Sequence, residues 1–215
     1  MRERNPVETP IRFWNDRRKI QLRPGPIRPD VRPNLVGALR RGGVLIRISR
    51  GVGTGPTRLA AFDAALHDAG IANFNLVRMS SVIPPGSVVR EVSGSQQVPG
   101  QHGDLLYCVY ADAYASTPGD EAWAGVAWSN RRHDNAGLFV EHHGLSETAV
   151  RHDLDATLDD LGTRRDGDFV IGGQVLSSAR CVDRPVCALV VASYRTVGWD
   201  HGSDPTNGST GSGAP

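Results

Sequence analysis

Two helical patterns stand far apart in this chain, and strand-like runs fill most of the remaining sequence. The first pattern lies within residues 57–71 and has Gly70 as its expected stop, a residue type that commonly follows the last helical turn. The second covers residues 146–162, with Ser146 as the expected N-cap and Gly162 as the expected stop. A doubly wound sheet needs a helix after nearly every strand, so this order predicts an α+β fold built of layers.

The strand-like runs either alternate apolar with polar residues or form short apolar segments bounded by glycine and proline. A chain of 215 residues that is 39% hydrophobic is long enough to bury the core of one domain, expected at 42–200. Strands are expected at 43–49, 73–80, 87–92, 105–113, 122–129, 136–142, 168–180 and 186–197.

The two ends of the chain differ in composition from this body. Residues 1–41 are rich in proline and carry eleven Arg or Lys against four acids, which suits contact with nucleic acid or another acidic surface. The segment has few aromatic residues for base stacking, so we favour an extended arm lying on the body or on a neighbouring subunit. Residues 201–215 are mostly Gly, Ser and Pro and are expected to be disordered.

Cysteine use and hydropathy indicate the compartment. The three cysteines show no Cys-x-x-Cys spacing, and their odd number suits free thiols in the cytoplasm better than a set of disulfides. No apolar run approaches the roughly 18 residues that span a bilayer, and the N-terminus lacks the apolar segment of a signal peptide. Seven histidines occur without His-Glu-x-x-His or a Cys/His cluster, so no metal site is expected.

The glycine run "GVGTGPT" (51–57) joins an expected strand to an expected helix, which is where phosphate-binding loops occur. It lacks both Gly-x-Gly-x-x-Gly and Gly-Lys-Ser/Thr, and Pro56 removes one backbone donor from such a loop. We therefore interpret the run as a tight strand-to-helix connection, with close approach of the backbone to a ligand as the alternative.

Two acids occupy positions that local periodicity turns toward apolar neighbours. Glu141 shares a strand face with Phe139, and a carboxyl in apolar surroundings can have a raised pKa and donate a proton; a solvent-facing edge position is the alternative. At 100° per residue, Asp63 falls about 40° from Leu59 and about 60° from Leu66, at the edge of the expected buried stripe. A carboxylate there needs an internal arginine or a basic ligand.

Ser80 and Ser81 close the apolar run "NLVRMSSVIPP", which is expected to deliver them to a buried site. In a strained turn, the second hydroxyl of such a pair can attack the preceding carbonyl. The resulting ester can eliminate to dehydroalanine, which hydrolyses to a pyruvoyl group and leaves the chain cleaved. Ser177 and Ser178 form a second pair within an ordinary strand pattern, so a serine pair alone identifies nothing.

The wider context distinguishes the two pairs. The stretch "GVGTGPTRLAAFDAALHDAGIANFNLVRMSSVIPP" resembles the central signature of the pyruvoyl-dependent arginine decarboxylases, and "GLFVEHHG" resembles the segment that carries their catalytic glutamate. In order of elements, the resemblance covers roughly residues 42–198.

The resemblance implies a role for five residues of this chain. Cleavage would fall between Ser80 and Ser81, and Ser81 would become the covalent pyruvoyl cofactor. Asn75 matches the asparagine that assists processing, Glu141 the proton donor, and Asp63 the acid that receives the substrate guanidinium.

The resemblance also implies an activity and an assembly. The family fold is an αββα sandwich of mainly antiparallel strands, assembled as trimers or hexamers with active sites between subunits. The activity would convert L-arginine to agmatine and CO2 through an imine with the pyruvoyl group. Ala60 and Ala72 replace the family's usual Asn and Gly, respectively. The same chemistry on histidine or aspartate, and a non-processing paralogue that only binds a ligand, remain the alternatives.

Overall fold

The computed structural model describes residues 42–94, 98–165 and 168–199. The predicted basic arm (1–41) and the predicted tail (201–215) lie outside these described residues. The described part contains β1 (Leu45–Thr54), α2 (Arg58–Asp68), β2 (Asn75–Arg78), β3 (Val82–Ile83), β4 (Val88–Glu91), β5 (Leu105–Ala115), β6 (Glu121–Arg131), β7 (Gly137–Gly144), α3 (Glu147–Thr163), β8 (Phe169–Arg180) and β9 (Val186–Val197).

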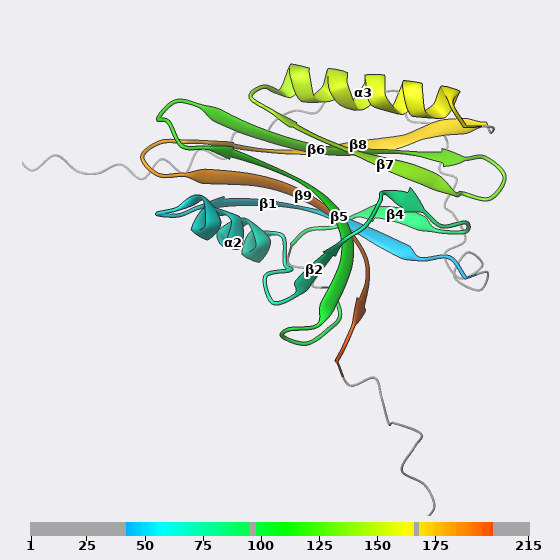
Figure 1. Ribbon diagram of the computed structural model, residues 1–215, viewed down its shortest axis with the longest axis horizontal. Helices are drawn as coiled ribbons and strands as arrows, with labels where there is room; N and C mark the ends of the chain where they lie inside the picture. The colour runs from blue at the N-terminus through cyan, green and yellow to red at the C-terminus, as the bar shows by residue number, and fades with distance from the viewer. Residues whose placement is uncertain (1–41, 95–97, 166–167, 200–215) are drawn as a thin grey trace, which may run out of the picture. The chain divides into compact units, whose positions relative to one another are not determined.

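The strands form two sheets that pack face to face, with one helix on the outer face of each (Figure 1). The five-stranded sheet has the order β2-β5-β9-β1-β4, and the four-stranded sheet has the order β3-β7-β6-β8. Only the β1/β4 and β2/β5 pairs are parallel among the described strands. The predicted αββα sandwich of mainly antiparallel strands is therefore confirmed.

Each junction between layers has its own apolar cluster. Residues such as Ile48, Val109 and Phe139 fill the space between the two sheets. Ala65 and Leu189 belong to the cluster between α2 and the five-stranded sheet. A third cluster lies under α3 on the four-stranded sheet. Burial of these three clusters away from water stabilises the four layers together.

The glycine run lets α2 lie directly on β1. A Cβ atom at Gly51 would overlap the carbonyl oxygen of Ala65, and one at Gly53 would overlap that of Ala61. At Gly55 a Cβ would stand 2.7 Å from the Ala60 side chain. The run serves close packing of helix on strand, which agrees with the predicted tight connection.

The prediction that Leu59 and Leu66 both lie on the buried face of α2 is partly wrong, because α2 lies so close to β1. The helix buries Ala61, Ala65 and Leu66, whereas Leu59 is 76% exposed. A helix resting on glycines contacts the sheet best through small side chains, so the alanines define its buried face. Asp63 lies about 150° from the centre of that face at 100° per residue, and its side chain is exposed.

The second helix follows its expected start but not its expected end. Ser146 is the N-cap, and its hydroxyl accepts from the Ala149 N–H. The helix continues through Gly162 to Thr163, because a glycine costs a helix only about 1 kcal/mol and does not by itself end one. No helix in the described ranges is long and apolar enough to cross a membrane.

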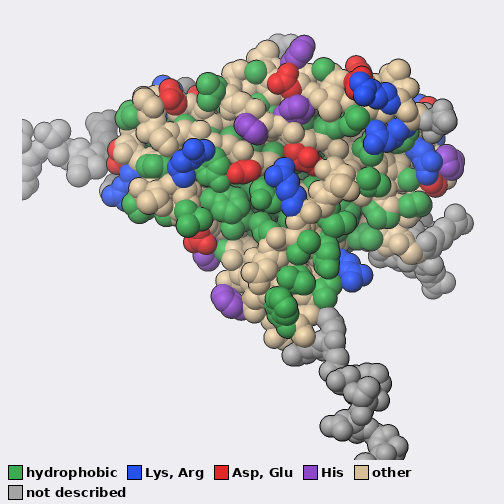
Figure 2. Space-filling view, viewed as in Figure 1, with side chains coloured by type: hydrophobic (Ala, Val, Ile, Leu, Met, Phe, Trp, Pro, Cys, Tyr) green, Lys and Arg blue, Asp and Glu red, His purple; other side chains and the backbone are tan. Residues whose placement is uncertain are grey.

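Charged side chains of both signs are interspersed on the face of the molecule shown in Figure 2. Nucleic-acid-binding proteins gather cationic side chains into a stripe or patch. On the face in view, several Lys or Arg side chains lie near one another at the upper right, with acidic side chains beside them.

Candidate active site

The serine pair lies where the chain crosses from one sheet to the other. β2 belongs to the five-stranded sheet, and the Met79 N–H continues its ladder by donating to the Cys108 carbonyl at 2.8 Å. At Val82, the residue directly after Ser81, the chain is already in the four-stranded sheet, as β3. The predicted strand at 73–80 is therefore too long, since the chain must leave the first sheet to reach the second.

The crossing gives Ser81 a strained backbone. Its φ is 66°, and Asn135 is the only other non-glycine residue with a positive φ in the described part of the chain. This left-handed region costs a residue other than glycine about 1–3 kcal/mol. Ser81 is half-buried and Ser80 is exposed, so the pair lies at the edge of the sandwich and not in the buried site expected from sequence.

Glu141 faces Ser81 from the adjacent strand β7. The Ser81 hydroxyl donates a hydrogen bond to Glu141 Oε1 at 2.5 Å, a short distance for this type of contact. Glu141 is half-buried and lies opposite Val126, which belongs to the cluster between the sheets, as does Phe139. The predicted shared face of Phe139 and Glu141 is confirmed, and it turns the carboxyl toward the serine.

Two further donors hold the peptide that follows Ser81. The Phe139 N–H donates to the Ser81 carbonyl at 2.8 Å, and the Tyr194 hydroxyl donates to the Val82 carbonyl at 3.0 Å. Burial raises the pKa of Tyr194, and the nearby Glu141 carboxylate raises it further, so the phenol keeps its proton. Sequence reasoning missed Tyr194, although a tyrosine within the apolar run of β9 was an available signal.

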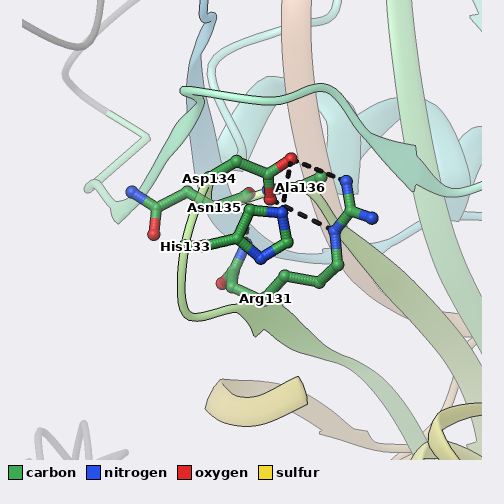
Figure 3. A network of polar contacts seen from close by, with 6 residues as sticks. Arg131, His133, Asp134, Asn135 and Ala136 are labelled. Atoms are coloured by element: carbon green, nitrogen blue, oxygen red, sulfur yellow. Dashed lines mark hydrogen bonds and ion pairs between the residues drawn. The ribbon is translucent and has the colours of Figure 1, made fainter. Parts of the chain in front are cut away.

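A salt-bridged hairpin supports the strand that carries Glu141. In the turn between β6 and β7, Arg131 contacts Asp134 at 2.6 Å, and the Ala136 N–H donates to Asp134 Oδ1 at 3.0 Å (Figure 3). Partial burial acts to raise the pKa of Asp134, but these two partners outweigh it and leave the pKa lowered. The Gly86 N–H donates to the Asp134 carbonyl at 2.6 Å, which ties the loop after β3 to the same turn.

The other two predicted site residues lie elsewhere. Asn75 is exposed at the start of β2, and its Nδ2 donates to the Gly103 carbonyl at 2.6 Å. Asp63 is 64% exposed on α2 and lies 3.9 Å from His67. Within one copy of the chain, the contacts described for Asn75 and Asp63 do not reach Ser81 or Glu141.

The second serine pair has ordinary contacts. Ser177 and Ser178 lie within β8, near its C-terminal end, and the Ser177 hydroxyl donates to the Gly51 carbonyl at 3.1 Å. Neither residue has a positive φ. This pair lacks the strained backbone and the carboxylate partner of Ser81.

Fold and site together define a four-layer α+β protein in which a strained serine, at the crossing between two sheets, hydrogen-bonds a carboxylate. The model of the family described as pyruvoyl-dependent arginine decarboxylase matches residues 45–195, well over half of the chain. The chain belongs to this family.

Curated relatives agree with this assignment. A pyruvoyl-dependent arginine decarboxylase of Halobacterium salinarum is 46% identical over 97 residues, which cover 45% of this chain and 58% of that protein. One from Methanococcoides burtonii is 36% identical over 137 residues, which cover 58% of this chain and 73% of that protein. The matched part of this chain thus spans little more than half of the Halobacterium relative.

A solved structure of pyruvoyl-dependent histidine decarboxylase aligns with a TM-score of 0.37 and 16% identity, over 47% of this chain and 55% of that one. At that level of similarity the fold rests on the layers observed in this chain, and not on the alignment.

Proposed function

We propose that this chain is a self-processing enzyme that decarboxylates L-arginine to agmatine and CO2, using a pyruvoyl group made from its own Ser81. The observation that carries the proposal is the Ser81–Glu141 hydrogen bond at a residue with a strained backbone. The names of the relatives support the reaction and its substrate.

Self-cleavage begins with the Ser81 hydroxyl. Its oxygen attacks the carbonyl carbon of Ser80, and Glu141 accepts the hydroxyl proton as general base. The C–N bond between the two residues then breaks, and its nitrogen takes up a proton and becomes the free amine of residue 81. An ester now joins the Ser80 carbonyl to the oxygen of residue 81, and the backbone strain at Ser81 is released.

Elimination then separates the two chains. Loss of the Cα proton of residue 81 expels Ser80 as a carboxylate and leaves dehydroalanine. Water adds to the imine tautomer of that residue and ammonia leaves, which yields the pyruvoyl group. Negative charge builds on the Ser81 carbonyl oxygen as the Cα proton departs. The Phe139 N–H already donates to that oxygen and is therefore placed to stabilise the charge.

The topology keeps the two products together. After cleavage at 80–81, β1 and β2 belong to the shorter chain, and β4, β5 and β9 belong to the longer one. β1 lies between β9 and β4, and β2 pairs with β5, so the five-stranded sheet needs both chains. The pyruvoyl group would remain beside Glu141 without a covalent link to residue 80.

In the decarboxylation, the pyruvoyl group supplies a carbonyl that condenses with the substrate amine and withdraws the electron pair left by CO2. Glu141, whose Oε1 accepts the Ser81 hydroxyl, would return a proton to the substrate Cα. The Phe139 N–H keeps its bond to the carbonyl of residue 81 throughout.

The substrate's guanidinium is assigned to Asp63. A carboxylate can accept two parallel hydrogen bonds from a guanidinium, a geometry that an ammonium group cannot reproduce. Because Asp63 and Asn75 lie apart from Ser81 within one copy, the proposal places them at the site of a neighbouring copy in a trimer or a pair of trimers. The three free, buried cysteines support a cytoplasmic location.

Mass spectrometry of the intact purified protein tests the self-cleavage. We expect two fragments of 80 and 135 residues, the larger carrying a pyruvoyl group, in place of the 215-residue chain. Ser81→Ala should prevent cleavage, whereas Ser178→Ala, a matched change in the exposed serine of the other pair, should not. A single species of 23.1 kDa would contradict the proposal.

Release of CO2 from labelled amino acids tests the substrate. Arginine should be turned over in preference to histidine and aspartate. Faster turnover of either of the other two would keep the chemistry and overturn the substrate assignment.

A further inference from the structure

Tyr194 reaches the self-cleavage segment from the opposite sheet. It lies on β9 in the five-stranded sheet, is 5% exposed, and donates its hydroxyl proton to the Val82 carbonyl at 3.0 Å. Val82 immediately follows Ser81 and begins β3 in the four-stranded sheet. This hydrogen bond therefore links the two sheets at the residue next to the bond that is cleaved.

The geometry of β3 explains why the Val82 carbonyl needs such a donor. β3 has two residues and lies at the edge of its sheet, where β7 is its neighbour. In an antiparallel pair the backbone groups of alternate residues point toward and away from the neighbouring strand. The Phe139 N–H bonds the Ser81 carbonyl, so the Val82 carbonyl points away from β7 and takes its donor from Tyr194.

The surroundings of Tyr194 join it to the rest of the site. Its ring meets Phe139 edge to face, with the ring centroids 6.1 Å apart. Phe139 supplies the N–H that holds the Ser81 carbonyl, and Glu141 is close enough to raise the pKa of the Tyr194 phenol. The three side chains thus form a continuous group around residue 81.

We propose that Tyr194 is a positioning residue that holds the peptide after residue 81 from the side that β7 leaves open. Before cleavage, it helps to keep Ser81 in the conformation that points its hydroxyl at Glu141. After cleavage, residue 81 begins a chain and has lost its covalent tether to Ser80. A two-residue edge strand such as β3 separates easily from its sheet when it lies at a chain end. The hydrogen bond from Tyr194 to Val82 prevents this separation. This inference rests on the proposed self-cleavage at that residue.

The test compares Tyr194→Phe, which removes the hydroxyl and keeps the ring, with a matched control, Tyr114→Phe. Tyr114 lies on β5 of the same sheet, and the Arg58 guanidinium of α2 lies over its ring, 4.4 Å from the centroid. Freshly synthesised chains are sampled over time, and the uncleaved fraction is measured by mass. The Tyr194→Phe variant should cleave about tenfold more slowly, the value of one hydrogen bond. Tyr114→Phe should cleave at the rate of the unchanged chain.

Steady-state kinetics of fully cleaved protein give a second measurement. Tyr194→Phe should lower kcat for arginine about tenfold and change KM less than about twofold, because the hydrogen bond orients residue 81 and does not bind substrate. Replacing Tyr194 with p-aminophenylalanine restores an N–H donor at the same place and should recover most of the cleavage rate. The p-aminophenylalanine variant also tests the role of the hydrogen bond if the phenylalanine variant folds poorly.

Equal cleavage rates for Tyr194→Phe and the unchanged chain would overturn the role of Tyr194. Equal slowing by Tyr194→Phe and Tyr114→Phe, or failure of p-aminophenylalanine to rescue a folded protein, would also overturn it. Absence of cleavage in the unchanged chain would instead refute the proposed function.

Discussion

Replacing Glu141 with glutamine removes one proton-accepting group and leaves the size and shape of the side chain almost unchanged. Glu141 Oε1 accepts the Ser81 hydroxyl at 2.5 Å, and a glutamine amide oxygen can accept the same hydrogen bond. An amide cannot take up the proton when the serine oxygen attacks. The variant should therefore fold normally and cleave much more slowly.

The size of the loss follows from the role of the carboxylate. A positioned general base contributes about 10²- to 10⁴-fold to a rate, which corresponds to about 3–5 kcal/mol in the activation free energy. Strain at Ser81, worth about 1–3 kcal/mol, remains in the variant and continues to favour attack on the Ser80 carbonyl. We therefore expect slow residual cleavage and not its complete absence.

The assay follows the uncleaved fraction by mass after synthesis, with Glu147→Gln as the matched control. Glu147 lies on α3 and pairs with Arg151 at 2.8 Å, so the same chemical change there should leave cleavage unaltered. Thermal unfolding of both variants checks that the fold is retained. Cleavage of Glu141→Gln within about threefold of the unchanged chain would refute the role of Glu141 as base, since even the low end of the expected loss is about 100-fold.

Three further changes test the packing, the hairpin and the substrate site. Gly53→Ala should destabilise the protein by about 1–3 kcal/mol in urea unfolding, because the added Cβ would overlap the Ala61 carbonyl. Gly162→Ala is the control: it lies in a helix with open space around it and should stabilise the protein by about 0.5–1 kcal/mol. Asp134 has a lowered pKa in the fold, so it stabilises the protein above its ordinary value of 3.8, and that contribution is lost as pH falls through the lowered pKa. The stability difference between the unchanged chain and Asp134→Asn should accordingly shrink in acid, and a difference independent of pH would count against the ion pair. Asp63→Asn should leave cleavage intact and lower kcat/KM for arginine about 10- to 100-fold, as loss of a charged hydrogen-bond partner predicts, whereas undiminished turnover would remove Asp63 from the site.

Local periodicity was enough to predict most elements of this fold. Alternation located the long strands, and Ser146 and Gly70 marked the helix ends correctly, because capping and strand alternation depend on a few consecutive residues. The same alternation placed Glu141 on the face of Phe139. The order of elements along the chain was sufficient to predict an α+β fold built of layers, whereas the αββα arrangement was implied by the resemblance to the family.

The remaining features of the fold and site depend on contacts between segments that are distant in sequence. A local sequence pattern carries no information about which distant segment a residue will contact. Leu59 fits an apolar stripe in the sequence. The glycines of β1 instead allow the alanine face of α2 to pack against the sheet, so Leu59 and Asp63 are exposed to solvent. The two Ser-Ser pairs of the chain, at 80–81 and 177–178, look alike in the sequence. Only the crossing between sheets gives Ser81 its positive φ, and only the packing of the two sheets face to face brings the Tyr194 hydroxyl to the next peptide.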